Sequence, residues 1–292
     1  MKLQTRIIDV HAHVIPEVDD GSREMEESLE MLKMAAEQGV CAVIATPHDS
    51  RRRKSLDLQE RVWQLQDQIQ KKYPDFCVYV GQETYYHSDL KERLKKGEAY
   101  TMAGSRYVLV EFSPSVVYKE LYYGIRNLRE AGYLPILAHM ERYHCFRQEG
   151  TEELENMGCV FQMNYDSLQG SWFQKETRWC RKQVESGVID LLGTDMHRID
   201  WRAPEIGQVL SWLDGHVSPE RIQQLVYKNP LKIIRKEKIK QAKELLQYSN
   251  YRIQEISEYL SFSNQSSFTK CFKLETGMTP KEFRKSCFKQ TR

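Results

Sequence analysis

The sequence of 292 residues lacks any apolar run close to the roughly 18 residues that a membrane-spanning helix needs. Its first residues, MKLQTRIIDV, also lack the apolar core of a secretory signal. The sequence has seven cysteines and no CxxC pair. An odd number of cysteines without such a pair fits a reducing compartment better than a disulfide framework. We therefore expect a cytoplasmic protein.

The sequence also lacks the motifs of cysteine-dependent phosphatases and of nucleotide-binding enzymes. No cysteine is followed by an arginine six residues later, which is the spacing that a cysteine-dependent phosphatase needs in its phosphate-binding loop. Neither a P-loop nor a GxGxxG dinucleotide fingerprint is present. The composition, with 40% hydrophobic and 29% charged residues, nevertheless predicts a packed globular protein rather than a disordered one.

Charge is distributed unevenly along the chain. Residues 236–292 contain 12 Lys and Arg against 6 Asp and Glu, a net charge of +6, whereas the preceding 235 residues carry a net charge of −4. A mildly acidic body followed by a basic tail predicts two domains, 1–235 and 236–292, with different partners. A basic segment is also what nucleic-acid binding requires.

Short apolar runs alternate with amphipathic stretches over the first 200 residues. Residues 24–38, 56–72 and 118–131 have apolar residues at helical spacing. The apolar runs between them are typical of buried strands and cover residues 7–10, 41–45, 78–80, 107–110, 134–138, 160–163 and 189–192. This alternation predicts an α/β fold with a parallel sheet or barrel.

Histidine or acidic residues follow six of these seven runs. Because the carboxyl ends of barrel strands meet at one face, we expect these residues to lie together. Their nitrogen and oxygen atoms, with no thiolate among them, suit several divalent metals. The candidates are His11, His13, His48, Glu83, Glu111, His139, Asp195 and His197, with Asp20 of the turn VDDGS as a further ligand.

Several stretches resemble the polymerase-and-histidinol-phosphatase (PHP) superfamily, beginning with the motifs HAH at 11–13, TPH at 46–48 and DMH at 195–197. Longer stretches narrow the resemblance to the CpsB-type manganese-dependent tyrosine-protein phosphatases of bacterial capsule and exopolysaccharide systems. They are IDVHAHVIPEVDDGS (8–22), ATPH (45–48), GQETYY (81–86), VEF (110–112), LAHMERY (137–143) and GTDMHRIDWRAP (193–204). The resemblance covers about residues 6–235.

This resemblance implies a distorted β/α (TIM-like) barrel that binds three divalent metals. Mn²⁺ is the expected ion, and Fe²⁺, Zn²⁺ or Co²⁺ are alternatives. The implied ligands are the nine residues above, and Glu83 would bridge metals. The implied activity is hydrolysis of phosphotyrosine on a bacterial tyrosine kinase that controls polysaccharide synthesis.

The expected chemistry follows from clustered cations. Such ions neutralise phosphate oxygens and lower the pKa of a bound water, which yields a hydroxide that attacks phosphorus. Arg142 and Arg202 are candidate phosphate clamps, because a guanidinium matches two phosphate oxygens at once. Asp195 and His197 are predicted to act catalytically as well as to bind metal, and Asn164 is expected to touch the same site.

The C-terminal segment has a different pattern. Asn229-Pro230 is expected to end the phosphatase-like part, and a helix with Ile239, Ala242, Leu245 and Leu246 on one face is expected to follow. Residues 252–277 then have helix-turn-helix spacing, with a turn at 261–263 and a second helix from about Asn264.

Residues 239–285 resemble the C-terminal half of an AraC-type DNA-binding domain, and the ending GMTPKEFRK carries much of the match. Domains of this type have two helix-turn-helix units, and the first has no counterpart here. The resemblance implies a recognition helix whose polar side chains reach DNA bases and phosphates. They are Asn264, Gln265, Ser266, Ser267, Thr269, Lys270 and Lys273.

Two classes of function therefore remain open. In the first, the chain is a metal-dependent phosphatase with an appended helical module. In the second, it is an AraC-like DNA-binding regulator whose PHP barrel senses a metal or a phosphorylated ligand. Within the enzyme class, histidinol phosphate or another small phosphate monoester is the alternative substrate to phosphotyrosine.

Overall fold

The computed structural model of the protein describes residues 6–49, 57–171, 173–260, 262 and 265–289. The chain divides into two compact units, Met1–Ile233 and Ile234–Arg292. None of the described helices is both long enough and apolar enough to cross a lipid bilayer.

Parallel strands form the centre of the first unit. Within the described residues they make a three-stranded sheet of order β1-β2-β3 and a five-stranded sheet of order β4-β5-β6-β7-β8. Every strand pair in both sheets is parallel. The strands are β1 (Ile7–Ala12), β2 (Val40–Ala45), β3 (Cys77–Val80), β4 (Glu83–Tyr85), β5 (Tyr107–Glu111), β6 (Leu134–Leu137), β7 (Val160–Asn164) and β8 (Leu191–Gly193).

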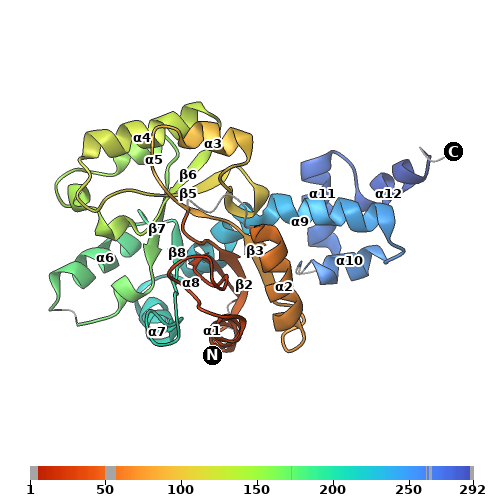
Figure 1. The fold of residues 1–292 in the computed structure, drawn as a ribbon, viewed down its shortest axis with the longest axis horizontal. Helices are drawn as coiled ribbons and strands as arrows, with labels where there is room; N and C mark the ends of the chain where they lie inside the picture. The colour runs from red at the N-terminus through yellow and green to blue at the C-terminus, as the bar shows by residue number, and fades with distance from the viewer. Residues whose placement is uncertain (1–5, 50–56, 172, 261, 263–264, 290–292) are drawn as a thin grey trace. The chain divides into compact units, whose positions relative to one another are not determined.

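Helices surround these strands, as Figure 1 shows for α1 to α7. They are α1 (Met25–Glu37), α2 (Leu58–Gln70), α3 (Leu90–Lys96), α4 (Tyr118–Glu130), α5 (Glu152–Asn156), α6 (Lys175–Glu185), α7 (Gly207–His216) and α8 (Pro219–Gln223). The prediction of a mixed α/β fold with parallel strands is thus confirmed. The predicted helices at 24–38, 56–72 and 118–131 correspond to α1, α2 and α4, although Leu56 lies outside the described residues.

Local sequence explains where these elements begin and end. In α2 the buried residues Leu58, Val62, Leu65 and Ile69 follow one another at helical spacing, and the Asp57 carboxylate accepts two backbone N–H groups at the start of the helix. All six residues of β1 are buried, as expected for a parallel strand that is covered on both faces. The seven predicted apolar runs each overlap one strand, whereas β4 was not predicted.

Two isolated bridges connect the two sheets at the carboxyl ends of their strands. Ala12 of β1 pairs with Met196, which follows β8, and His48, which follows β2, pairs with Glu83 at the start of β4. Glu83 therefore opens a strand instead of simply following β3, and its backbone is fixed beside that of His48. These bridges bring the ends of strands from both sheets to one edge.

The second unit is helical. It contains most of α9 (Asn229–Tyr248) together with α10 (Ile253–Tyr259), α11 (Gln265–Thr276) and α12 (Pro280–Lys289). Helix α9 begins ten residues before the predicted Ile239. It continues directly from α8 through a π-helical turn at Gln224–Lys228, so Pro230 does not interrupt the helical course of the chain. The predicted apolar stripe is confirmed, because Ile239, Ala242 and Leu246 belong to one buried cluster and Leu245 packs against it. The other members of this cluster come from α10, α11 and the residue after α10: Ile256, Leu260, Phe268 and Phe272.

Two glycines in helices provide a test of the packing in the first unit. A Cβ atom added to Gly124 of α4 would lie 2.7 Å from two ring carbons of Phe112, whereas one added to Gly215 of α7 would have no neighbour within 4 Å. Alanine normally stabilises a helix by up to about 1 kcal/mol relative to glycine. We expect Gly215→Ala to raise the free energy of unfolding by about 0.5 kcal/mol and Gly124→Ala to lower it by about 1–3 kcal/mol. Urea unfolding of both variants checks this, and equal effects would contradict the packing around Phe112.

Candidate metal centre

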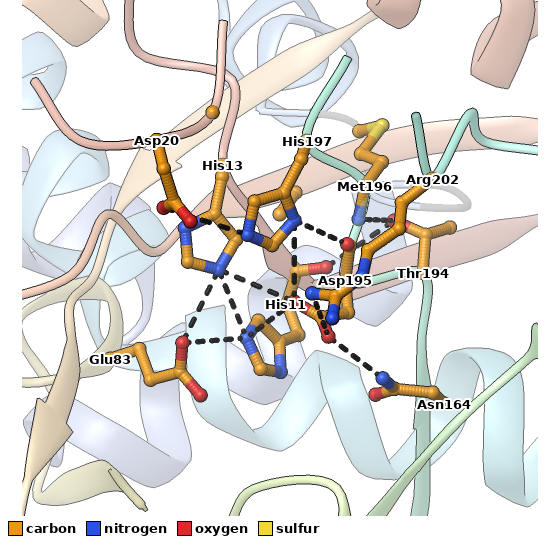
Figure 2. A network of polar contacts seen from close by, with 12 residues as sticks. His11, His13, Asp20, Glu83, Asn164, Thr194, Asp195, Met196, His197 and Arg202 are labelled. Carbon is orange, nitrogen blue, oxygen red and sulfur yellow. Dashed lines mark hydrogen bonds and ion pairs between the residues drawn. The ribbon is translucent and has the colours of Figure 1, made fainter. Parts of the chain in front are cut away.

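All nine predicted ligands lie in one connected cluster at the edge where the strand ends meet. His11 lies in β1 and His13 follows it; we call these two residues the histidine pair. The Nε2 atoms of the pair are 3.3 Å apart, and both side chains are fully buried. Figure 2 shows the pair pointing toward Glu83 on one side and toward Asp195 and His197 on the other. The remaining residues approach this pair from other strand ends.

Glu83 is the centre of the inner part of the cluster. Its Oε2 atom lies 3.2 and 3.3 Å from the Nε2 atoms of the histidine pair and 3.1 Å from Nδ1 of His48. Its Oε1 atom lies 2.9 Å from Nε2 of His139, which also approaches Glu111 at 3.4 Å. The side chain is buried, so both carboxylate oxygens are surrounded by imidazole groups from different parts of the chain.

Asp195 directs its two oxygens toward different partners. Its Oδ1 atom faces the histidine pair, at 3.4 Å from each Nε2 atom. Its Oδ2 atom accepts hydrogen bonds from Asn164 Nδ2 at 2.8 Å and Arg142 Nη2 at 2.7 Å, and from Arg202 Nη1 at 3.2 Å. The two predicted phosphate clamps therefore converge on the same ligand oxygen, which the sequence did not indicate. The predicted contact of Asn164 with the site is confirmed.

Asp20, His48 and His197 form the outer part of the cluster. Asp20 Oδ1 lies 3.7 Å from His48 Nε2 and 3.8 Å from His197 Nε2. The His197 ring stacks on that of His13, with centroids 4.0 Å apart. The side chains of Asp20 and His48 are 53% and 40% exposed and that of Glu111 is 22% exposed. The other six members of the cluster are buried: His11, His13, Glu83, His139, Asp195 and His197. The cluster is therefore open to solvent on the side of Asp20 and His48.

Three overlapping groups in the described chain have ligand atoms close enough together to bind a metal ion, within 4.8 Å of one another. Their donors are imidazole nitrogens and carboxylate oxygens, a set that suits divalent first-row metals. Glu83, His13 and His48 each belong to two groups, so neighbouring ions would share ligands. The groups are His13 with Asp20, His48 and His197; His11 with His13, Glu83 and Asp195; and His48 with Glu83 and Glu111.

The close contacts shift the pKa values of these groups in opposite directions. Burial alone would lower the pKa of His139, but hydrogen bonds to Glu111 and Glu83 outweigh it and raise that pKa to about 9. Burial likewise opposes the charge of Glu83, yet the surrounding histidines hold its pKa well below its ordinary range. The same balance raises the pKa of both members of the histidine pair and lowers that of Asp195. Without metal, protons on histidine thus balance the buried carboxylates.

His197 differs from the other buried histidines. Burial and the neighbouring His13 lower its pKa to about 4, so that its imidazole is neutral near pH 7. Its Nδ1 atom lies 2.8 Å from the backbone oxygen of Asp195. If Nδ1 carries the proton, Nε2 keeps a lone pair directed toward Asp20 and is ready to bind a metal.

Three site residues have a left-handed backbone, which is uncommon for residues other than glycine. The φ angles are 33° at His139, 53° at Asp195 and 54° at Arg202. Such conformations cost on the order of 1–3 kcal/mol each and persist only where the surroundings impose them. Here they turn the chain directly after β6 and β8, which aims His139 and Asp195 into the cluster.

Sequence reasoning missed the residues that hold the ligands. Asp19 Oδ2 lies 2.7 Å from Nδ1 of His13 and accepts the backbone N–H of His48, and the only signal for it was its place beside Asp20. Gln162 is fully buried in β7, and its Oε1 atom lies 3.1 Å from Nδ1 of His11. Partners of this kind fix the ring orientation of a metal-binding histidine and leave Nε2 for the metal.

The predicted nucleic-acid residues lie on or beside α11 of the second unit. Asn264 lies outside the described residues, and so does the side chain of Ser267. Five of the others line one surface hollow of about 680 Å³: Gln265, Ser266, Thr269, Lys270 and Lys273. The exposed face of α11 is thus polar and basic, while Phe268 and Phe272 on its opposite face are buried in the core.

Comparison with known proteins identifies the first unit. The family model described as "Capsular polysaccharide synthesis, CpsB/CapC" matches residues 7–235. The chain belongs to the CpsB/CapC family. It is 31% identical to the tyrosine-protein phosphatase CpsB of Streptococcus pneumoniae over 241 residues, which cover 78% of this chain and 98% of that protein. The resemblance inferred from the motifs is thereby confirmed.

A solved structure supports the same relationship. The structure described as YwqE from Bacillus subtilis and CpsB from Streptococcus pneumoniae, unique metal-dependent tyrosine phosphatases, superposes with a TM-score of 0.71 at 26% sequence identity. The superposition covers 78% of this chain and 94% of that one. This CpsB/CapC chain therefore shares its fold with phosphatases that need a metal.

The C-terminal resemblance is confirmed as well. A helix-turn-helix domain model matches residues 216–286, which begins earlier than the predicted 239 and overlaps the CpsB/CapC match over residues 216–235. The chain is also 39% identical to the xylose operon regulatory protein of Haemophilus influenzae over 109 residues, 37% of this chain and 28% of that protein. This CpsB/CapC protein thus contains a helix-turn-helix domain.

The raised histidine pKa values predict how the metal-free protein responds to pH. Protonated His139 stabilises the folded state fully below its unfolded pKa of about 6.5, and this contribution is lost as pH rises through about 9. The histidine pair acts with the same sign. In the presence of a chelator, we expect the melting temperature to fall between pH 6.5 and 9, and His139→Gln to flatten that decline. A melting temperature that rises over this range would contradict the assignment.

Proposed function

We propose that this protein is a metal-dependent tyrosine-protein phosphatase, and that its catalytic activity resides in residues 1–235. The main observation is the cluster around Glu83, which gathers nine nitrogen- and oxygen-bearing side chains from seven segments. Eight of them form three groups with metal-binding spacing, and His139 contacts Glu83 beside these groups. Membership of the CpsB/CapC family supports this proposal, because curated relatives in it are named tyrosine-protein phosphatases. A capsule or exopolysaccharide role, with a bacterial tyrosine kinase as substrate, follows from the same relationship.

We propose that the nine residues bind three divalent ions, with Mn²⁺ as the expected metal and with Glu83 shared between two of them. When bound, such ions neutralise phosphate oxygens and generate a hydroxide near neutral pH. The chain contributes the geometry: Glu83 presents Oε2 to the histidine pair and Oε1 to His139. Asp19 and Gln162 hold the two rings of the pair through their Nδ1 atoms.

The substrate phosphate is proposed to approach from the open side of the cluster. Arg142 and Arg202 lie at this site with side chains 31% and 30% exposed, and each anchors one nitrogen on Asp195. A guanidinium has five N–H donors, so the remaining donors are free to bind phosphate oxygens. Asp195 would thus align both arginines while its Oδ1 atom serves the metal, and the neutral His197 completes the outer group.

We also propose that the two sheets together form the distorted barrel implied by the resemblance. The bridge between Ala12 and Met196 joins β1 to the segment after β8, and the bridge between His48 and Glu83 joins the segment after β2 to β4. These two connections link the sheets at both of their junctions, which supports a closed arrangement. The domain division after residue 235 stays a prediction, close to the boundary between the compact units after Ile233.

The first test is hydrolysis of a phosphotyrosine peptide by the purified chain with Mn²⁺, with and without a chelator. We expect chelator-sensitive release of phosphate. Loss of a ligand in His139→Ala should lower kcat/KM at least about 100-fold, and Arg142→Ala should lower it about 100-fold or more, because a charge-stabilising donor is lost. His216→Ala, which removes an exposed histidine on α7, is the matched control and should leave kcat/KM unchanged.

Histidinol phosphate serves as the competing substrate in the same assay. Faster turnover of histidinol phosphate than of the peptide would assign the site to a small monoester. If metal binds but neither substrate is hydrolysed, the phosphatase proposal fails, and a regulator that uses the first unit as a sensor becomes the better interpretation.

A second activity, DNA binding by the helix-turn-helix domain, is favoured by the exposed face of α11. Lys270 and Lys273 lie three residues apart, one helical turn, and line the same hollow as Gln265 and Thr269. Two cations on one helix face can contact neighbouring DNA phosphates, and the polar residues between them can reach base edges. We propose that this face binds DNA in a salt-dependent manner.

Fluorescence anisotropy with a duplex at several salt concentrations tests this second proposal. Lys270→Ala and Lys273→Ala should each weaken binding and lower the slope of log K against log salt by about 1, as expected for the loss of one phosphate contact. Lys281→Ala, on the exposed surface of α12, is the control. No binding at 50 mM salt, or an equal effect of all three substitutions, would refute the proposed interface.

A further inference from the structure

A separate cavity of about 340 Å³ lies directly beside the metal centre. Thr194 and Arg202 line it, and both are close to Asp195: Thr194 precedes it in the chain, and Arg202 contacts its Oδ2 atom. Figure 2 shows Thr194 and Arg202 on the side of Asp195 that faces away from Glu83. The cavity is therefore within reach of a substrate whose phosphate occupies the metal centre. None of the nine proposed ligands lines it.

The wall of this cavity includes apolar surface that the fold leaves uncovered. Ile199 and Trp201 line it and are 46% and 45% exposed. Trp201 also connects the cavity with the metal centre, because its ring packs edge-on against that of His197 at 4.9 Å and lies under the Arg202 guanidinium at 4.6 Å. Exposed apolar side chains beside an active site are a typical feature of a binding surface.

The charge of the cavity is negative. Three acidic residues line it: Asp166, Asp200 and Glu205. Asp200 is paired with Arg23 at 2.8 Å, whereas Asp166 and Glu205 have no ion-pair partner among the described residues. The one arginine in the lining, Arg202, directs a nitrogen to Asp195. Two carboxylates are thus left without a cation beside a site that attracts phosphate.

Tyr165 also contributes to the wall of this cavity and is 1% exposed. The cavity therefore combines apolar walls with two carboxylates that have no ion-pair partner among the described residues.

We propose that this cavity binds the side chain of a lysine or arginine that flanks the phosphotyrosine in the substrate protein. The inference rests on the proposed phosphatase activity and adds a specificity-determining subsite to it. The aliphatic part of such a side chain would pack on Ile199 and Trp201, as long cationic side chains do on apolar surfaces. Its charged end would meet Asp166 and Glu205. A phosphate on one side and a cation on the other would together fix the direction in which the peptide crosses the site.

The test is a set of phosphotyrosine peptides that differ from one another at a single position. Each of the three residues on either side of the phosphotyrosine is varied in turn, and at each position Lys, Leu and Glu are compared. At one position at least, the wild-type enzyme should show a kcat/KM about 10-fold higher for Lys than for Glu, with Leu between them. The double variant Asp166→Asn/Glu205→Gln should reduce this preference to less than about 3-fold. Higher salt should weaken the preference in the wild type, because exposed charges are screened.

Two controls separate this subsite from the phosphatase activity. The double variant Glu26→Gln/Glu120→Gln removes the same charge from exposed positions elsewhere on the first unit and should keep the full preference for Lys. Free phosphotyrosine does not extend to the cavity, so its chelator-sensitive hydrolysis should be equal in all three proteins. Hydrolysis of every peptide at the same rate, or a preference for Leu over Lys, would overturn the subsite while leaving the phosphatase intact. No hydrolysis of free phosphotyrosine would refute the phosphatase itself.

Discussion

A single buried carboxylate, that of Glu83, sets the requirements that the rest of the first unit meets. A charge in this setting is stable only if positive groups surround it, and the chain supplies imidazoles from β1, from the segment after β2 and from the segment after β6. These segments are far apart in sequence and meet only where parallel strands end. The fold and the site therefore depend on each other, because Glu83 can be buried among histidines only where the strand ends converge.

The same requirement shows why protons and metal ions are alternatives at this site. Without metal, the carboxylates raise the pKa of three histidines, which then carry the compensating charge. A divalent ion supplies that charge more compactly and needs the histidines neutral, so its binding must release protons. His197 is the exception, since its pKa is already low, and it lies on the open side with Asp20. Without metal, the histidine pair and His139 thus carry the compensating charge, whereas His197 is already neutral.

The members of the cluster, apart from Asp20, could be predicted from the sequence to lie together, because they follow recognisable apolar runs and parallel strands bring such positions to one edge. Glu83 was predicted to follow a strand but begins one, because the three-residue strand β4 is too short to show a period. Asp19 and Gln162 escaped notice for another reason. Their roles depend on hydrogen bonds to His13 and His11, and the Gln162 contact spans 151 residues, which no local pattern records. The left-handed backbone at His139 and Asp195 could not be predicted from the sequence either. Tertiary packing imposes it, although residues other than glycine disfavour this conformation.

The two family matches overlap over residues 216–235, so this stretch fits both the CpsB/CapC model and the helix-turn-helix model. The long helix α9 begins within this overlap and the pair α10–α11 follows it, so the first unit of an AraC-type domain would have to use residues 216–235. In that stretch Ile222, Leu225 and Val226 are buried in the core of the first compact unit. Exposing them to form a DNA-binding surface would cost about 1.5–3 kcal/mol for each side chain. These residues therefore belong to the core of the first unit, and the exposed face of α11 is the surface that we propose for DNA contact. A chain with one reading helix reaches a single stretch of major groove, which limits specificity unless two chains bind side by side.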